Sequence, residues 1–224
     1  MRYRTFLWDL DGTLTDPKEG ITRSVQYALH RLNRPCPPLD DLEWVIGPPL
    51  RQALQDLLAT DDPALAGQAL SLYRQRYGET GMYENTPYPG IAGLLADIQA
   101  RGGHNVLATA KPLVFAEKIL AHFQLERYFS LIMGSGLNGE FVEKPDLIQE
   151  ILRRLPEADR HTTVMIGDRR YDVEGARQNG IDVISVAYGY GSLPELHAAA
   201  PDGIALSVDH LRELLLGKHT VRQD

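Results

Sequence analysis

The chain has 224 residues, of which 43% are hydrophobic and 24% are charged. This composition is typical of a folded globular protein and excludes a disordered or fibrous chain. The formal net charge of −7 gives no overall attraction to nucleic acid polymers or anionic membranes. The single cysteine, Cys36, excludes an internal disulfide and a multi-cysteine zinc site. No apolar run approaches the roughly 20 residues that span a bilayer, and Asp9 interrupts the N-terminal apolar run too early for a signal peptide. We therefore expect a cytoplasmic protein.

Short apolar runs alternate with amphipathic segments along most of the chain. The runs are short enough for strands and apolar on both faces, as in a parallel sheet that is covered by helices on each side. They lie at residues 4–9, 105–109, 129–133, 163–167 and 181–187. The amphipathic segments between them have helical periodicity. This alternation predicts an α/β fold with a doubly wound parallel sheet.

Residues 16–85 depart from this alternation, because they contain several helical patterns and no convincing strand. Prolines and other turn-forming residues flank this region at both boundaries. We therefore predict an inserted α-helical cap at 16–85 and a catalytic α/β core made of 1–15 and 86–217. The remaining residues, 218–224, are expected to form a disordered tail.

Two acidic residues, Asp9 and Asp11, follow the first predicted strand. Ligands of open α/β sheets bind at the carboxyl ends of the strands, and alternation along the strand places both carboxylates on one side. Gly12 lets the backbone turn there and leaves its N–H groups accessible. Carboxylates this close repel each other unless a cation or a proton lies between them. Taken alone, the Asp-Gly pair is equally consistent with a simple turn.

Further polar residues follow two later strands, and Lys144 lies just before a predicted helix, from where its ammonium can reach the same edge of the sheet. These residues are Thr109 with a hydroxyl, Lys111 and Lys144 with amines, and Asp168 and Asp172 with carboxylates. Ligand sets made of oxygen atoms alone are typical of Mg²⁺ and not of zinc. A hydroxyl and an ammonium opposite such an ion suit a bound phosphoryl group.

These residues resemble, in order, the four motifs of the haloacid dehalogenase superfamily. The matching segments are Asp9-Leu10-Asp11-Gly12-Thr13, Thr109, Lys144 and Gly167-Asp168 with Asp172. The resemblance covers nearly the whole chain, and the helical insert lies where the family has its cap. Members that process haloalkanoates lack the second Asp, here Asp11, so the resemblance implies a phosphatase.

The resemblance also implies the roles of the matched residues. Asp9 would be the nucleophile that forms an aspartyl-phosphate, and Asp11 the general acid and then the general base. Gly12, Thr109, Ala110 and Lys144 would bind the phosphate. Mg²⁺ would be held by Asp9, the backbone carbonyl of Asp11 and Asp168, with Asp172 acting through water or from a second layer.

Several weaker features resemble the phosphoglycolate phosphatase and 5′-nucleotidase-like branch of the superfamily, among them the segments 46–50, 109–112 and 134–139. We therefore expect the partner to be a small phosphorylated metabolite, with Glu19, Arg51 and Lys111 as candidates for substrate specificity. Tyr188 and Tyr190 are candidates for the border of the site.

Two alternatives remain open at this point. The same core chemistry would serve phosphoryl transfer within a sugar, as in the phosphosugar mutases. A non-catalytic binding protein is disfavoured by the intact set of motif residues. Residues 134–139 also satisfy the dinucleotide fingerprint G-x-G-x-x-G, but no helix follows them at once, as that fingerprint requires. The substrate itself and the oligomeric state are not determined by the sequence.

Overall fold

The computed structural model describes residues 1–217, and the predicted tail at 218–224 lies outside the described residues. The chain divides into two compact units. We call Met1–Leu14 with the residues from Pro87 onward the core unit, and Thr15–Thr86 the helical unit. No helix in residues 1–217 is long and apolar enough to cross a membrane.

The core unit contains a six-stranded sheet in which every neighbouring pair is parallel. Its strands, in spatial order, are β5 (Phe129–Ser135), β4 (His104–Pro112), β1 (Thr5–Trp8), β6 (Thr163–Gly167), β7 (Asp182–Val186) and β8 (Gly203–Ala205). The predicted doubly wound α/β fold is confirmed. The prediction of five strands was incomplete, because β8 has only three residues and its pattern is too short to stand out in the sequence.

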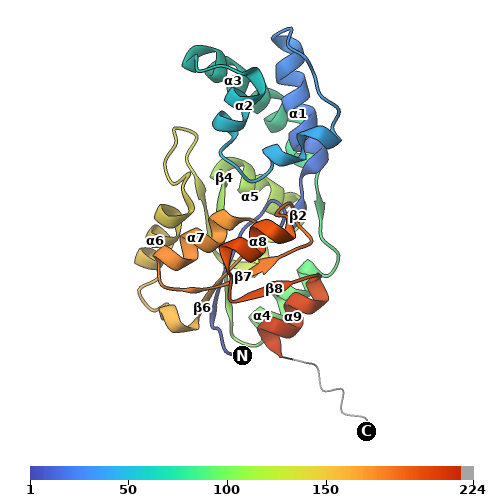
Figure 1. Ribbon diagram of the computed structural model, residues 1–224. Coiled ribbons are helices and arrows are strands. Elements are labelled where there is room, and N and C mark those ends of the chain that lie inside the picture. Colours follow the sequence, from blue (N-terminus) through green and yellow to red (C-terminus); the bar gives the residue numbers. More distant parts are fainter. Residues whose placement is uncertain (218–224) are drawn as a thin grey trace. The chain divides into compact units, whose positions relative to one another are not determined.

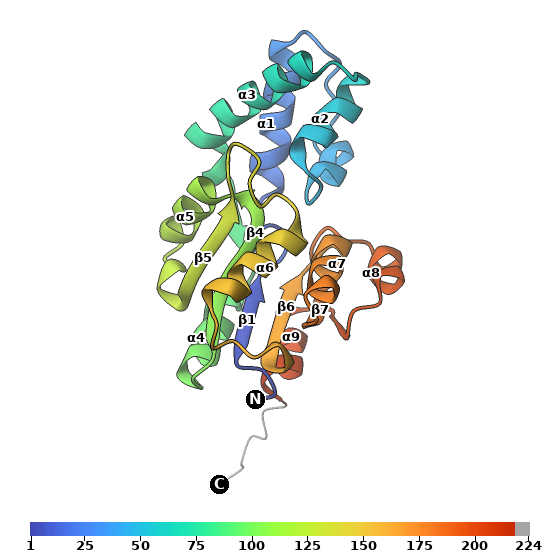
Figure 2. The same ribbon diagram turned by 90° about the vertical axis from the view of Figure 1, so that its left-hand side faces the viewer.

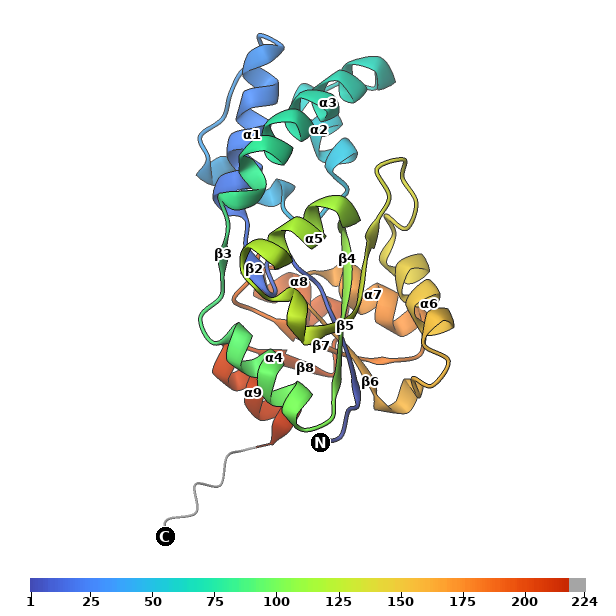
Figure 3. The same ribbon diagram turned by 180° about the vertical axis from the view of Figure 1, so that it is seen from behind.

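Helices cover both faces of this sheet (Figure 1, Figure 2). One face carries α6 (Lys144–Arg154), α7 (Arg170–Gln178) and α8 (Leu193–Ala199). The opposite face, seen in Figure 3, carries α4 (Ile91–Ala100), α5 (Leu113–His122) and α9 (Val208–Leu216). Short 3-10 turns, η3 (Glu126–Tyr128) and η4 (Arg160–Thr162), precede β5 and β6. The hydrophobic cluster between α6, α7 and the sheet includes Leu7, Val106 and Met165 of the strands, Ile148 of α6 and Val173 of α7.

The central strand β1 determines where polar groups converge. It pairs with β4 on one side and with β6 on the other, both in parallel, and all four of its residues are buried. The carboxyl ends of these three strands therefore meet at one edge of the sheet, as the sequence predicts for the motif residues.

The helical unit consists of three helices, α1 (Lys18–Arg31), α2 (Leu50–Leu58) and α3 (Pro63–Glu79), with short 3-10 turns η1 (Asp40–Val45) and η2 (Gly81–Tyr83). Helices α1 and α3 pack against each other. Two-residue strands, β2 (Thr15–Asp16) and β3 (Thr86–Pro87), pair with each other where the chain enters and leaves this unit. Strands this short leave no periodic signal, so the sequence did not predict them.

Candidate active site

Lys144 lies at the centre of the charged groups of the core unit. It is the first residue of α6, and its side chain is 4% exposed. Its Nζ lies 3.1 Å from Oδ1 of Asp9 and 2.8 Å from Oδ1 of Asp172, and it donates a hydrogen bond of 2.9 Å to the carbonyl of Ala108. The Lys144 stem passes Gly175 of α7, where a Cβ atom would lie only 2.8 Å from Cγ of Lys144. Gly175 thus leaves the room through which this lysine reaches the site.

The electrostatic environment of Lys144 favours its charged form. Burial opposes the charge, but the carboxylates of Asp172 and Asp9 outweigh burial and raise the pKa of the ammonium. The two acidic neighbours therefore stabilise the ammonium form of this lysine. Such a group is suited to offset the negative charge of a bound phosphoryl group.

Three carboxylates, from Asp9, Asp168 and Asp172, form a cluster in which one oxygen of each lies within 4.8 Å of the others. Burial, followed by the neighbouring carboxylates, raises the pKa of Asp168 well above its usual value. Burial also raises the pKa of Asp172, to about 6, although Lys144 opposes the shift. Carboxylates with such raised pKa values are stabilised when a cation lies between them.

One oxygen of this cluster is well suited to a metal ion. Oδ1 of Asp168 is buried and accepts no hydrogen bond from any residue of the described part of the chain. An unsatisfied buried carboxylate oxygen is costly unless another ligand binds it. Oxygen donors alone favour a hard divalent cation. The residues present therefore fit such an ion.

Asp11 forms a second ion pair, separate from that of Asp9. Its Oδ2 lies 2.7 Å from Nζ of Lys111. Burial raises the pKa of the Asp11 carboxyl, and the nearby Lys111 ammonium offsets this only in part. Asp9 and Asp11, two residues apart, therefore face different cations.

An irregularity in β4 places Lys111 at this position. Thr109 pairs with Gly134 and Pro112 pairs with Ser135, so Ala110 and Lys111 are additional residues on β4. Such bulges redirect side chains and are common beside active sites. The buried hydroxyl of Thr109 accepts a hydrogen bond of 3.2 Å from the Lys111 N–H, and the carbonyl of Ala110 accepts one of 2.7 Å from the Ser135 hydroxyl. The sequence predicted this strand to end at 109, because alternation does not reveal a bulge.

Gly12 serves the site in two ways. Its φ of 77° belongs to the left-handed region that favours glycine, and a Cβ atom there would overlap the carboxylate of Asp168. The turn at Gly12 is therefore shaped to fit against Asp168. A simple Asp-Gly turn would not require this contact.

The other two specificity candidates, Glu19 and Arg51, belong to the helical unit. Glu19 is exposed in the first turn of α1 and forms an ion pair of 2.8 Å with Arg23. Arg51 is exposed in the first turn of α2, where, after burial, its charge contributes to lowering the pKa of Arg74. Their roles toward a substrate remain predictions.

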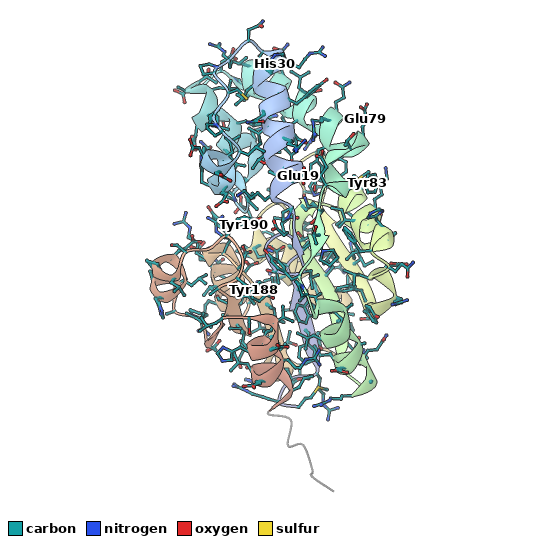
Figure 4. All side chains as sticks on the ribbon, turned by 90° about the vertical axis from the view of Figure 1, so that its right-hand side faces the viewer. Glu19, His30, Glu79, Tyr83, Tyr188 and Tyr190 are labelled. Carbon is teal, nitrogen blue, oxygen red and sulfur yellow. The ribbon has the colours of Figure 1, made fainter. Side chains whose placement is uncertain are left out.

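The sequence did not identify the contribution of the loop after β7. The backbone N–H of Tyr190 donates a hydrogen bond of 2.7 Å to Oδ2 of Asp168, and the Tyr188 hydroxyl donates one of 3.1 Å to the carbonyl of Thr13. Figure 4 labels both tyrosines on this loop. The only sign of this loop in the sequence is the alternation of tyrosine and glycine in residues 187–192. From that pattern we expect the tyrosines to border the site, but the pattern does not predict the hydrogen bond to Asp168.

Comparison with known proteins identifies the family of the chain. The sequence model described as haloacid dehalogenase-like hydrolase matches residues 6–186, a range that contains every group of the acidic cluster. The chain belongs to this family.

Individual relatives are similar over nearly the whole chain. A protein of Pseudomonas aeruginosa named 5′-nucleotidase is 46% identical over 215 residues, which cover 96% of each chain. The tyrosine-protein kinase PtkA of Mycobacterium tuberculosis is 35% identical over 93% of this chain and 71% of its own length. A phosphoglycolate phosphatase of Pseudomonas syringae is 30% identical over 96% of this chain and 79% of its own length.

Solved structures agree with this assignment. The crystal structure of a predicted phosphatase from Clostridium acetobutylicum is 41% identical and has a TM-score of 0.91, over 97% of this chain and 100% of that one. The comparisons confirm the predicted family, the predicted fold and the predicted class of enzyme, a phosphoric monoester hydrolase.

Proposed function

We propose that the protein is a Mg²⁺-dependent phosphatase that hydrolyses small phosphomonoesters through an aspartyl-phosphate on Asp9. The observation that carries this proposal is the difference between two neighbouring carboxylates. Asp9 faces the ammonium of Lys144, whereas burial favours the protonated form of Asp11 by raising its pKa. Two carboxyl groups with different environments supply a nucleophile and an acid within one site.

The proposed reaction has two steps. A carboxylate oxygen of Asp9 attacks phosphorus, the ester P–O bond breaks, and protonated Asp11 gives its proton to the leaving oxygen. In the second step the Asp11 carboxylate takes a proton from a water molecule, whose oxygen attacks phosphorus. The bond between Asp9 and phosphorus then breaks, which releases inorganic phosphate and restores both residues.

The remaining residues would hold the phosphoryl group in place. The Thr109 hydroxyl, the ammonium of Lys144 and the backbone N–H groups at Gly12 and Ala110 are its proposed partners. Asp9, the backbone carbonyl of Asp11 and Asp168 would hold Mg²⁺, with Asp172 acting through water or from a second layer. The ion would supply positive charge opposite the phosphoryl oxygens.

The proposed substrate is a small metabolite similar to phosphoglycolate or to a nucleoside monophosphate, and neither nucleic acid polymers nor membranes are proposed as partners. The names of the two phosphatase relatives support this class. Lys111 supports it as well, because its ammonium lies beside Asp11, the proposed donor to the leaving oxygen. A negative charge on the leaving group would thus find a cation next to the bond that breaks. A cytoplasmic location agrees with such a substrate.

A second candidate is phosphoryl transfer involving protein tyrosine, which the relative named as a tyrosine-protein kinase favours. The same nucleophile would accept a phosphoryl group, and the acceptor would then be a tyrosine instead of water. The mutase alternative differs in the same way, since its acceptor is a second hydroxyl of a sugar.

Phosphate release from a panel of esters, with Mg²⁺ and then with a chelator, tests the proposal. The panel would contain phosphoglycolate, nucleoside monophosphates, sugar phosphates, pyrophosphate and a phosphotyrosine peptide. We expect release that requires Mg²⁺ and is fastest with phosphoglycolate or a nucleoside monophosphate. Release unaffected by chelator would contradict the metal requirement. Isomer formation from a sugar phosphate, or labelling of a tyrosine peptide by ATP, without phosphate release would replace the proposal by one of the alternatives.

A further inference from the structure

We propose that the loop 187–192 is a positioning element for the metal ligand Asp168, acting through Gly189, Gly191 and the backbone N–H of Tyr190. This inference rests on the proposed function, since Asp168 is one of the proposed ligands of Mg²⁺. It adds to the site a segment whose contribution lies in its backbone, and which carries none of the four family motifs.

The first observation is the close approach of this loop to Asp168. A Cβ atom on Gly189 would lie 2.6 Å from Oδ2 of Asp168 and would also overlap the Asp168 Cβ and the Gly12 carbonyl. A Cβ atom on Gly191 would overlap the backbone carbonyl of Asp168. Real Cβ atoms do not occur at such distances, so each added methyl group would force the loop or Asp168 to move.

The requirement at these two positions concerns space. Neither Gly189 nor Gly191 has a positive φ, so the left-handed conformations that favour glycine are not the reason for their presence. Gly12, in the turn after Asp11, also comes close to this carboxylate, since a Cβ atom on Gly12 would overlap Oδ2 of Asp168. Three glycines, Gly12, Gly189 and Gly191, therefore leave the space that Asp168 occupies.

The second observation is how the loop orients the carboxylate. The Tyr190 N–H binds Oδ2 of Asp168 at 2.7 Å, whereas Oδ1 is buried and has no hydrogen-bond partner within residues 1–217. An oxygen of Asp168 lies in the cluster with Asp9 and Asp172. One oxygen is thus fixed by the loop, and the other is left for a ligand, as is typical of ligands held by groups outside the metal's own shell.

Both ends of the loop are fixed to segments that carry site residues. At its start, the Tyr188 hydroxyl binds the carbonyl of Thr13, and the Tyr188 ring packs edge-on against Tyr88 at 4.8 Å. Beyond its end, Glu195 of α8 accepts hydrogen bonds of 3.0 Å from the Arg169 side chain and from the Arg170 N–H. The loop is therefore tied both to the turn after Asp11 and to the residues that follow Asp168.

Manganese affinity tests the inference, with Mn²⁺ as the probe and free Mn²⁺ measured by electron paramagnetic resonance on the full chain. Gly189→Ala is expected to weaken Mn²⁺ binding at least tenfold while circular dichroism shows a folded protein. Gly203→Ala is the matched control, because a Cβ there meets only ordinary contacts at 3.7 and 3.8 Å. Its Mn²⁺ affinity should stay within twofold of the unchanged protein.

The outcomes separate this inference from the proposed function. If the unchanged protein does not bind Mn²⁺, the proposed metal site is wrong, and the inference fails with it. If it binds Mn²⁺ and Gly189→Ala binds equally well, only the inference is overturned. If Gly189→Ala does not fold, Tyr188→Phe is measured instead, since it removes only the anchoring hydroxyl. A weakening of about threefold would then support the inference, and unchanged affinity would overturn it.

Discussion

The ammonium of Lys144 lies 2.8 Å from Oδ1 of Asp172, so the start of α6 and the first turn of α7 meet in one buried ion pair. Both side chains are almost fully buried. The same ammonium also faces Asp9, the proposed nucleophile, so Lys144 contacts two of the three carboxylates of the acidic cluster. Removing this cation would leave two carboxylates without their common partner.

Lys144→Met is therefore expected to affect both catalysis and stability. Loss of a cation that offsets charge on the phosphoryl group should lower phosphate release by about 100-fold or more. Breaking a buried ion pair should lower the free energy of unfolding by about 3–5 kcal/mol. Initial rates and urea denaturation measure the two effects. Lys118→Met, at an exposed position of α5, should change neither, and a near-normal rate for Lys144→Met would contradict the role of this residue.

Lys111→Met should change substrate selectivity. A charge-assisted contact contributes about 1.5–3 kcal/mol, so kcat/KM for phosphoglycolate should fall by about 10-fold to 100-fold, at 1.4 kcal/mol per factor of ten. Phenyl phosphate has no charge on its leaving group and should lose much less. Steady-state kinetics with both esters give the ratio. An equal loss of kcat/KM for both esters would show that Lys111 acts only on Asp11 and does not contact the leaving group of the substrate.

The sequence predicted that polar groups gather at one edge of the sheet, and Asp9, Asp168, Asp172 and Lys144 do lie close together in the structure. Asp9 and Asp168 directly follow β1 and β6, whereas Thr109 lies within β4, before its bulge. A parallel sheet brings the carboxyl ends of its strands to one edge. Periodicity and the rule on strand ends together were sufficient for this part. The three-residue strand β8 and the two-residue strands β2 and β3 were missed, because alternation over so few residues gives no signal.

Groups that act through backbone geometry could not be predicted from the sequence, for a different reason. The bulge that places Lys111 and the N–H that binds Asp168 depend on pairing between distant segments. Gly175 and Gly189 matter because other side chains come close to them, which the sequence does not reveal. Their identity as glycine is visible in the sequence, but the neighbour that requires it is not.

Asp202→Asn should lower stability in a pH-dependent way. Burial opposes ionisation of Asp202, but the hydrogen bond from the Val183 N–H and the Arg177 guanidinium outweigh it and lower its pKa. Because its pKa is lower in the folded state, Asp202 stabilises the folded protein at pH values above its ordinary pKa of 3.8. This stabilisation is lost as the pH falls through the lowered pKa. Because the side chain is about one third exposed, we expect a loss of only about 1 kcal/mol at pH 7.

The difference in the free energy of unfolding between the unchanged protein and Asp202→Asn should therefore shrink as the pH falls from 5 toward 2. Urea denaturation at several pH values measures it. Glu157→Gln, at an exposed loop position, is the matched control and should show no such trend. A difference that stays constant with pH would contradict the assigned cause.

Detection of the phosphorylated residue tests the central claim most directly. Asp11→Asn lacks the proposed base for the second step, and p-nitrophenyl phosphate has a leaving group that needs no proton, so the intermediate should accumulate. After acid quench, peptide mass spectrometry should find the phosphoryl group on the peptide that contains Asp9. Asp9→Asn should show neither the label nor turnover while remaining folded. Turnover retained by Asp9→Asn, or a phosphoryl group on another residue, would contradict the account.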